Sequence, residues 1–111
     1  MEDPKTKTLI EEVITKTKAG RMRWQPTATV DEYFSILPSG FTIVIGVDTD
    51  GYTPQHVFVL RNADDQPLLR VTAGVDGVER NLLIDLHESA RRVALHVNVD
   101  VDKVLGELAR L

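Results

Sequence analysis

Cysteine is absent from the chain. Its absence excludes disulfide bonds, a thiol nucleophile and metal sites built on thiolates. A chain without cysteine fits a reducing compartment, and we expect the protein to lie in the cytoplasm.

Long apolar runs are also missing. The longest one, FTIVIGV at residues 41–47, is far shorter than the ~20 residues that a membrane-spanning helix needs. The first residues, MEDPKTKT, are polar and contain no apolar core of a secretion signal. We therefore expect no membrane partner.

The motifs that bind phosphates and metals are absent or incomplete. The chain has neither the GxGxxG loop nor the lysine-bearing phosphate loop. His87-Glu88 begins like a zinc-protease helix, but Arg91 stands where that motif requires its second histidine. The loop at residues 48–51, DTDG, begins like a calcium loop, but its twelfth position is Val59 instead of glutamate. We expect no metal and no cofactor.

The composition that remains is typical of one globular domain. The chain has 111 residues, of which 42% are hydrophobic and 27% are charged, enough for one core and too few for two. We expect a single α+β domain over residues 1–111, with residues 1–3 loose. The net charge of −4 argues against a dedicated nucleic-acid binder.

The chain is organised around residues 81–98, NLLIDLHESARRVALHVN, where apolar residues recur at helical spacing. Ile84 and Leu95 lie on a second, narrower stripe with Arg91 between them, so we expect an apolar contact on that side too. The main apolar arc, which should face the core, consists of Leu82, Leu83, Leu86, Ala90, Val93, Ala94 and Val97.

Two further helices are expected, one at each end. Residues 4–18 have helical spacing, with Pro4 at the start and Gly20 suited to closing the helix. A last short helix begins after Asp100, and because its stripe reaches Leu111 we expect it to be docked. That stripe consists of Val101, Val104, Leu105, Leu108 and Leu111.

Between these helices the apolar period changes to two, which predicts strands. Short turns join them, and strands joined by short turns pair antiparallel. We therefore predict a five-stranded antiparallel meander, with both C-terminal helices packed on one face. The predicted strands are residues 21–25, 32–37, 41–48, 55–62 and 68–73.

The central helix carries the candidate interaction and ligand sites. The first hypothesis is a non-enzymatic interaction module that binds itself or another protein through Ile84, Arg91 and Leu95. The second is an enzyme or ligand-binding protein with a pocket between sheet and helices, in which arginine holds an anion. On a solvated face, however, Glu88 would simply pair with an arginine three or four residues on. The ligand candidates are His87, Glu88, Ser89, Arg91, Arg92 and His96.

A third hypothesis is a weak nucleic-acid contact, because basic residues surround Trp24 and such clusters can bind a phosphate backbone and stack a base. These cations would equally well complement the negative C-terminal end of the first helix. On an edge strand they would also discourage aggregation through strand pairing. Trp24 alternates with the arginines, so it should point into the core. The basic residues are Lys16, Lys18, Arg21 and Arg23.

The segments KTKAGRMRWQPT and LHESARRVALHVNVDVDKVLGEL, and the order of elements around them, resemble a family of small bacterial α+β proteins with no assigned activity. The resemblance implies a bacterial, cytoplasmic origin and the α+β order, and it implies no catalytic residue. The matching residues are Lys18, Gly20, Trp24, Ala90, Arg91, Arg92, Ala94 and Asp100.

Overall fold

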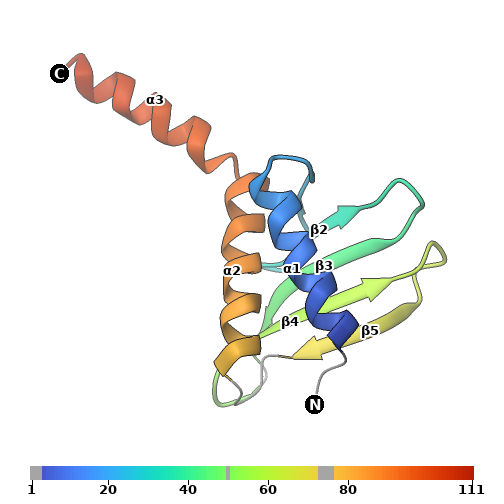
Figure 1. Cartoon of the computed structure of the whole chain (residues 1–111). Coiled ribbons are helices and arrows are strands. Elements are labelled where there is room, and N and C mark those ends of the chain that lie inside the picture. The colour runs from blue at the N-terminus through green and yellow to red at the C-terminus, as the bar shows by residue number, and fades with distance from the viewer. Residues whose placement is uncertain (1–3, 50, 73–76) are drawn as a thin grey trace.

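The computed structural model describes residues 4–49, 51–72 and 77–111, and it has the predicted α+β fold. A helix, α1 (Pro4–Lys18), precedes a five-stranded sheet, and two helices follow it, α2 (Gly77–Ala94) and α3 (Val97–Ala109) (Figure 1). The predictions for residues 1–3, for Asp50 in the calcium-like loop and for the turn before α2 concern positions outside the described residues.

The sheet is the predicted meander. Its strand order is β1-β2-β3-β4-β5, and every neighbouring pair is antiparallel. Short connections between consecutive strands therefore account for the whole topology. The strands are β1 (Gln25–Pro26), β2 (Tyr33–Ile36), β3 (Thr42–Asp48), β4 (Gln55–Arg61) and β5 (Pro67–Thr72).

The first strand is shorter than predicted because the end of α1 uses part of it. Gly20 adopts a left-handed conformation with φ 74°. Its amide donates to the carbonyl of Thr17 at 3.1 Å, and the amide of Arg21 donates to the carbonyl of Lys16 at 3.0 Å. This pair of bonds is the Schellman arrangement that ends a helix. Arg21 therefore caps α1 instead of pairing in the sheet, and pairing begins only at Gln25.

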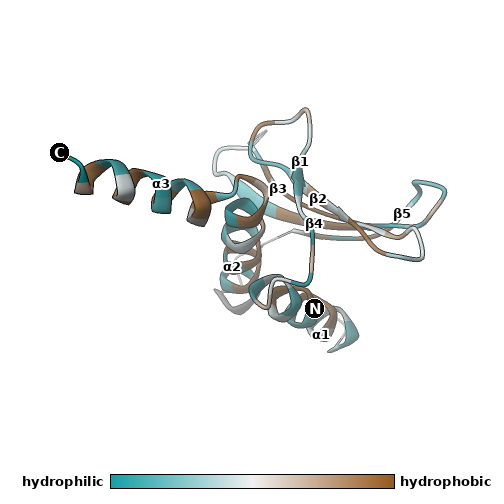
Figure 2. Cartoon of the chain, turned by 90° about the horizontal axis from the view of Figure 1, so that it is seen from above, coloured by the Kyte–Doolittle hydropathy of each residue, from teal (hydrophilic) through white to brown (hydrophobic). Residues whose placement is uncertain are grey.

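One face of the sheet carries the core. On β3, Ile43 and Ile45 are fully buried, as the alternation predicts, and Ile45 lies between Tyr33 of β2 and Phe58 of β4. The α2 helix covers this face with Leu83 and Leu86 among its buried residues. The buried side of α1 packs beside α2, and Figure 2 shows both helices on the same side of the sheet.

The last helix does not pack where we expected. His96 adopts a left-handed conformation, φ 53° and ψ 41°, and α3 then runs away from the sheet (Figures 1 and 2). The expectation that both C-terminal helices pack on one face is therefore wrong for α3, since α1 and α2 already occupy that face. The radius of gyration, 15.4 Å, accordingly exceeds the ~13 Å of a compact chain of this length.

Within the described residues, no helix is long and apolar enough to cross a membrane.

Candidate interaction site

The apolar stripe of α3 is open to solvent. Every α3 residue from Val99 onward is exposed. The stripe residues are about half accessible: Val101 46%, Val104 52%, Leu105 58% and Leu108 57%. Single exposed apolar residues are common on protein surfaces, but a continuous stripe along one helix marks a contact surface.

The stripe continues into a hollow at the junction of α2 and α3. This hollow has a volume of about 430 Å³, and Leu95, which directly follows α2, contributes to it together with the first half of the α3 stripe. Leu95 is 41% exposed, so the predicted second stripe of α2 and the stripe of α3 form one surface. The lining residues are Leu95, Val97, Asp100, Val101, Val104 and Leu105. We call this hollow the elbow.

Ile84, the other apolar residue of the predicted interface, is 39% exposed near the middle of α2. Glu88 and Arg91 separate it from Leu95. A carboxylate oxygen of Glu88 lies 3.6 Å from the guanidinium of Arg91 and 3.8 Å from that of Arg92. The pairing expected on a solvated face is thus present, and exposed pairs of this kind contribute only a few tenths of a kcal/mol.

His87 points toward the sheet, away from these ion pairs. Its Nε2 donates to the carbonyl oxygen of Asp31 at 2.8 Å. Its ring lies 5.7 Å from the ring of Tyr33 and 4.9 Å from that of His56, measured between centroids. His87 therefore joins α2 to the starts of β2 and β4, and the carbonyl acceptor determines which ring nitrogen carries hydrogen.

The environment of this histidine pair shifts two pKa values. Burial lowers the pKa of His56, and the neighbouring His87 and Arg80 lower it further. Burial raises the pKa of Tyr33, and the carboxylate of Asp31 adds to the rise. Both groups are therefore neutral near pH 7. His56 lies on the same strand as Phe58 and Leu60, and no sequence spacing connects it to His87.

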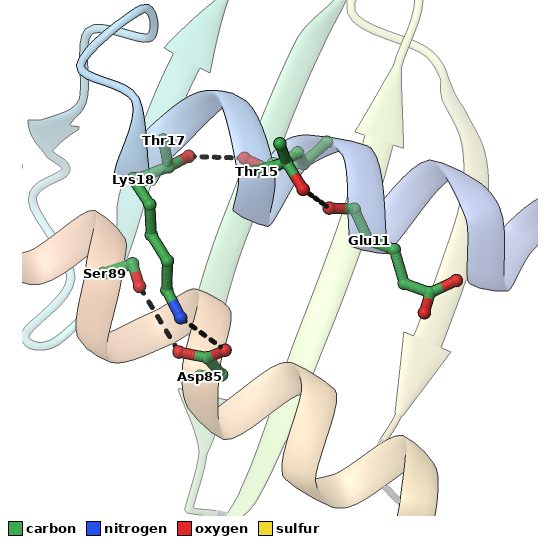
Figure 3. Close-up of polar contacts among 7 residues, drawn as sticks. Glu11, Thr15, Thr17, Lys18, Asp85 and Ser89 are labelled. Atoms are coloured by element: carbon green, nitrogen blue, oxygen red, sulfur yellow. Dashed lines mark hydrogen bonds and ion pairs between the residues drawn. The ribbon is translucent and has the colours of Figure 1, made fainter.

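Ser89 belongs to a different contact, shown in Figure 3. Its hydroxyl donates to Asp85 at 3.5 Å, and the other oxygen of Asp85 accepts a hydrogen bond from Nζ of Lys18 at 3.0 Å. The Lys18–Asp85 ion pair connects the end of α1 to α2, and both side chains are about half exposed. Lys18, one of the basic candidates, therefore has a structural partner.

The remaining ligand candidate, His96, is exposed at the start of α3. The ligand candidates consequently lie in separate places: His87 faces the sheet, Ser89 faces α1, and Glu88 with its arginines faces solvent. Among the residues that the structure describes, no three histidine or acidic side chains are grouped to hold a metal ion.

The tryptophan of the basic segment is buried, as its alternation predicts. Its indole Nε1 donates to Oγ1 of Thr17 at 3.0 Å. The ring is therefore part of the core, and in this position Trp24 cannot stack against a nucleic-acid base. Arg21 and Arg23 are exposed, and Arg23 borders a shallow hollow of about 140 Å³ with Gln25 and Phe34.

The face of the sheet opposite the helices holds a hollow of about 320 Å³. Its lining includes Val44, Gly46 and Val59, and a pair formed by Arg70 and Asp48 at 3.6 Å lies at its rim. The polar groups that border it, Glu32, Asp48 and Arg70, come from exposed or half-exposed side chains.

No protein-family model matches the sequence, and the comparisons with curated proteins and with solved structures found no match either.

Proposed function

We propose that the protein is a non-enzymatic interaction module that associates with a second copy of itself through α3. The observation that carries the proposal is the exposed stripe of α3, continuous with Leu95 directly after α2. The predicted interface enters the proposal through Leu95, whereas Arg91 and Ile84 lie farther back along α2, Ile84 by about 11 residues or ~16 Å.

The length of α3 supports this proposal. A helix of 13 residues is marginal in water on its own, because nucleation is costly and helices in proteins owe most of their stability to packing. Among the described helices and strands, α3 contacts only α2, so most of the required packing has to come from another molecule. A second copy supplies an apolar helix of the same length.

The free energy gained by burying the stripe favours reversible association. Burying the exposed half of one valine or leucine contributes about 1 kcal/mol. The stripe together with Leu95 then contributes roughly 5–6 kcal/mol per subunit, about twice that for the pair. Association itself costs ~4–15 kcal/mol. With a cost near the lower limit of ~4 kcal/mol, the net gain is about 6–8 kcal/mol, and we expect a dissociation constant of roughly 1–100 μM rather than an obligate dimer.

Sedimentation equilibrium of the whole chain, over about 1–300 μM, tests the proposal. We expect a monomer–dimer equilibrium that Val104→Asp weakens at least about tenfold, because the new carboxylates would have to be buried. The matched control is Val99→Asp, which changes an equally exposed valine of α3 on the side away from the stripe and should leave association unchanged. A monomer throughout the range, or equal effects of both variants, would overturn the proposal.

The single-domain organisation, the bacterial origin and the cytoplasmic location remain part of this proposal. The shared core of α1, α2 and the sheet supports the first. The sequence resemblance supports the second, and the absence of cysteine supports the third.

A further inference from the structure

We infer that the two α3 helices of the dimer pack antiparallel, with residues 108–111 of each subunit filling the elbow of the other. This inference rests on the proposed function, since it specifies how the second copy binds to the same surface.

The spacing of the stripe indicates a helix as the occupant. Val97 and four residues of the stripe, without the neighbouring Leu105, recur at alternating intervals of four and three residues, which is the repeat of a seam between two helices. The same repeat runs through all of α3 to Leu111, without interruption by a charged residue. The members are Val97, Val101, Val104, Leu108 and Leu111.

The position of the elbow determines whether the second helix packs parallel or antiparallel to α3. Leu95 lines the same hollow as the first half of the stripe, so the end of α2 lies on the face of α3 that the partner helix would cover. Figure 1 shows α2 meeting α3 at this end of the helix. A parallel partner would bring its own α2 into this space. An antiparallel partner places its own α2 at the opposite end of the pair and brings the end of its α3 toward the elbow, together with the following Leu111, which is fully exposed.

An antiparallel pair also aligns the stripe with itself. Val101 then lies beside Val104 of the partner subunit, and Val97 beside Leu108 of the partner subunit. Leu111 reaches Leu95 of the partner subunit. Two-fold symmetry repeats each contact, so the same patch is used by both subunits and the assembly closes as a dimer.

The absence of native cysteine makes cross-linking a direct test of direction. In the antiparallel pair, residue 108 and its copy are separated by about 11 residues along the helix axis, or ~16 Å. A disulfide needs Cα atoms within about 7 Å. In a parallel pair, the two copies of residue 108 face each other.

The experiment uses two single-cysteine proteins, Val97→Cys and Leu108→Cys, oxidised at a concentration at which sedimentation shows dimer. Both positions lie outside the core, so the fold is retained, and circular dichroism checks this. We expect a disulfide-linked dimer from the mixture and little from either protein alone. Val99→Cys, mixed with Leu108→Cys, is the control and should not cross-link, because Val99 lies off the stripe.

Efficient cross-linking of Leu108→Cys alone would show a parallel pair and overturn the inference while leaving self-association through α3 intact. If dimer is present but the mixture gives no cross-link, the register that places residue 97 beside residue 108 of the other subunit would also be overturned. Monomer in the sedimentation experiment, by contrast, would overturn the proposed function itself.

Discussion

Trp24 donates its indole hydrogen to the hydroxyl oxygen of Thr17, and this hydroxyl in turn donates to the carbonyl of Val13 at 2.7 Å. Thr17 and Trp24 are both buried, so each polar atom has its partner inside the core. The bond connects the last turn of α1 to the segment that leads into β1.

Removing this hydroxyl should destabilise the fold. Thr17→Val keeps the shape but leaves the indole nitrogen without an acceptor, and a buried donor without a partner costs about 1–3 kcal/mol. Urea denaturation measures the loss. Thr17→Ser retains the hydroxyl, so its free energy of unfolding should fall only by the contribution of the missing methyl group. Equal losses of stability in both variants would contradict the role of the bond.

Gly20 should be sensitive to substitution because of its backbone. Gly20→Ala places a side chain at φ 74°, where an L-residue is disfavoured by roughly 1–2 kcal/mol, although its Cβ would meet no atom within 4 Å. Thermal unfolding should show a lower midpoint. Gly106→Ala is the control: its Cβ also meets nothing, but it lies within helical α3, where alanine is favoured. A stable Gly20→Ala protein would exclude backbone strain as the reason for glycine.

Acid should destabilise the protein through His56. The folded state lowers the pKa of this histidine, so near its unfolded value of about 6.5 the unfolded chain binds more protons. Stability contributed by neutral His56 is therefore complete above pH 6.5 and is lost as the pH falls below it. Urea titrations between about pH 7.5 and 5 measure this dependence. His56→Gln should show a flatter profile, and an unchanged slope would contradict the assignment.

Charge reversal on α3 should strengthen the dimer. Asp100 and Glu107 lie on the same flank of the stripe, so in an antiparallel pair each faces the other's copy across the contact. Glu107→Lys converts both repulsive pairs into attractive ones and should lower the dissociation constant by about three- to tenfold at low salt. The double variant Asp100→Lys/Glu107→Lys should lose this gain. Asp102→Lys makes the same charge change on the other flank of the stripe. If it lowered the dissociation constant equally, the change in net charge alone would explain the effect.

The spacing of apolar residues predicted most of the fold, because it shows which residues can lie on the same face of a helix or strand. It located α1 at its observed bounds and placed Ile43 and Ile45 on the covered face of β3. It could not predict that Arg21 would complete the helix cap, because that depends on hydrogen bonds made after Gly20 turns.

The candidate site was less predictable for a similar reason. The sequence showed that α3 and Leu95 have apolar surface, but a stripe contains no information on what covers it. The contact between His87 and His56 joins residues from α2 and β4, and only the packing of the helix across the sheet brings them together. The pairing of Glu88 with Arg91 and Arg92 was predictable, since it depends on local helical spacing alone.

The left-handed turn at His96 separates two properties of this chain. Residues before it form the shared core, whereas every residue from Val99 onward is exposed. Substitutions beyond the turn can therefore change the affinity of association while the stability of the monomeric body, measured below the dissociation constant, stays the same. Selection or engineering can adjust partner affinity and foldability of this protein one at a time.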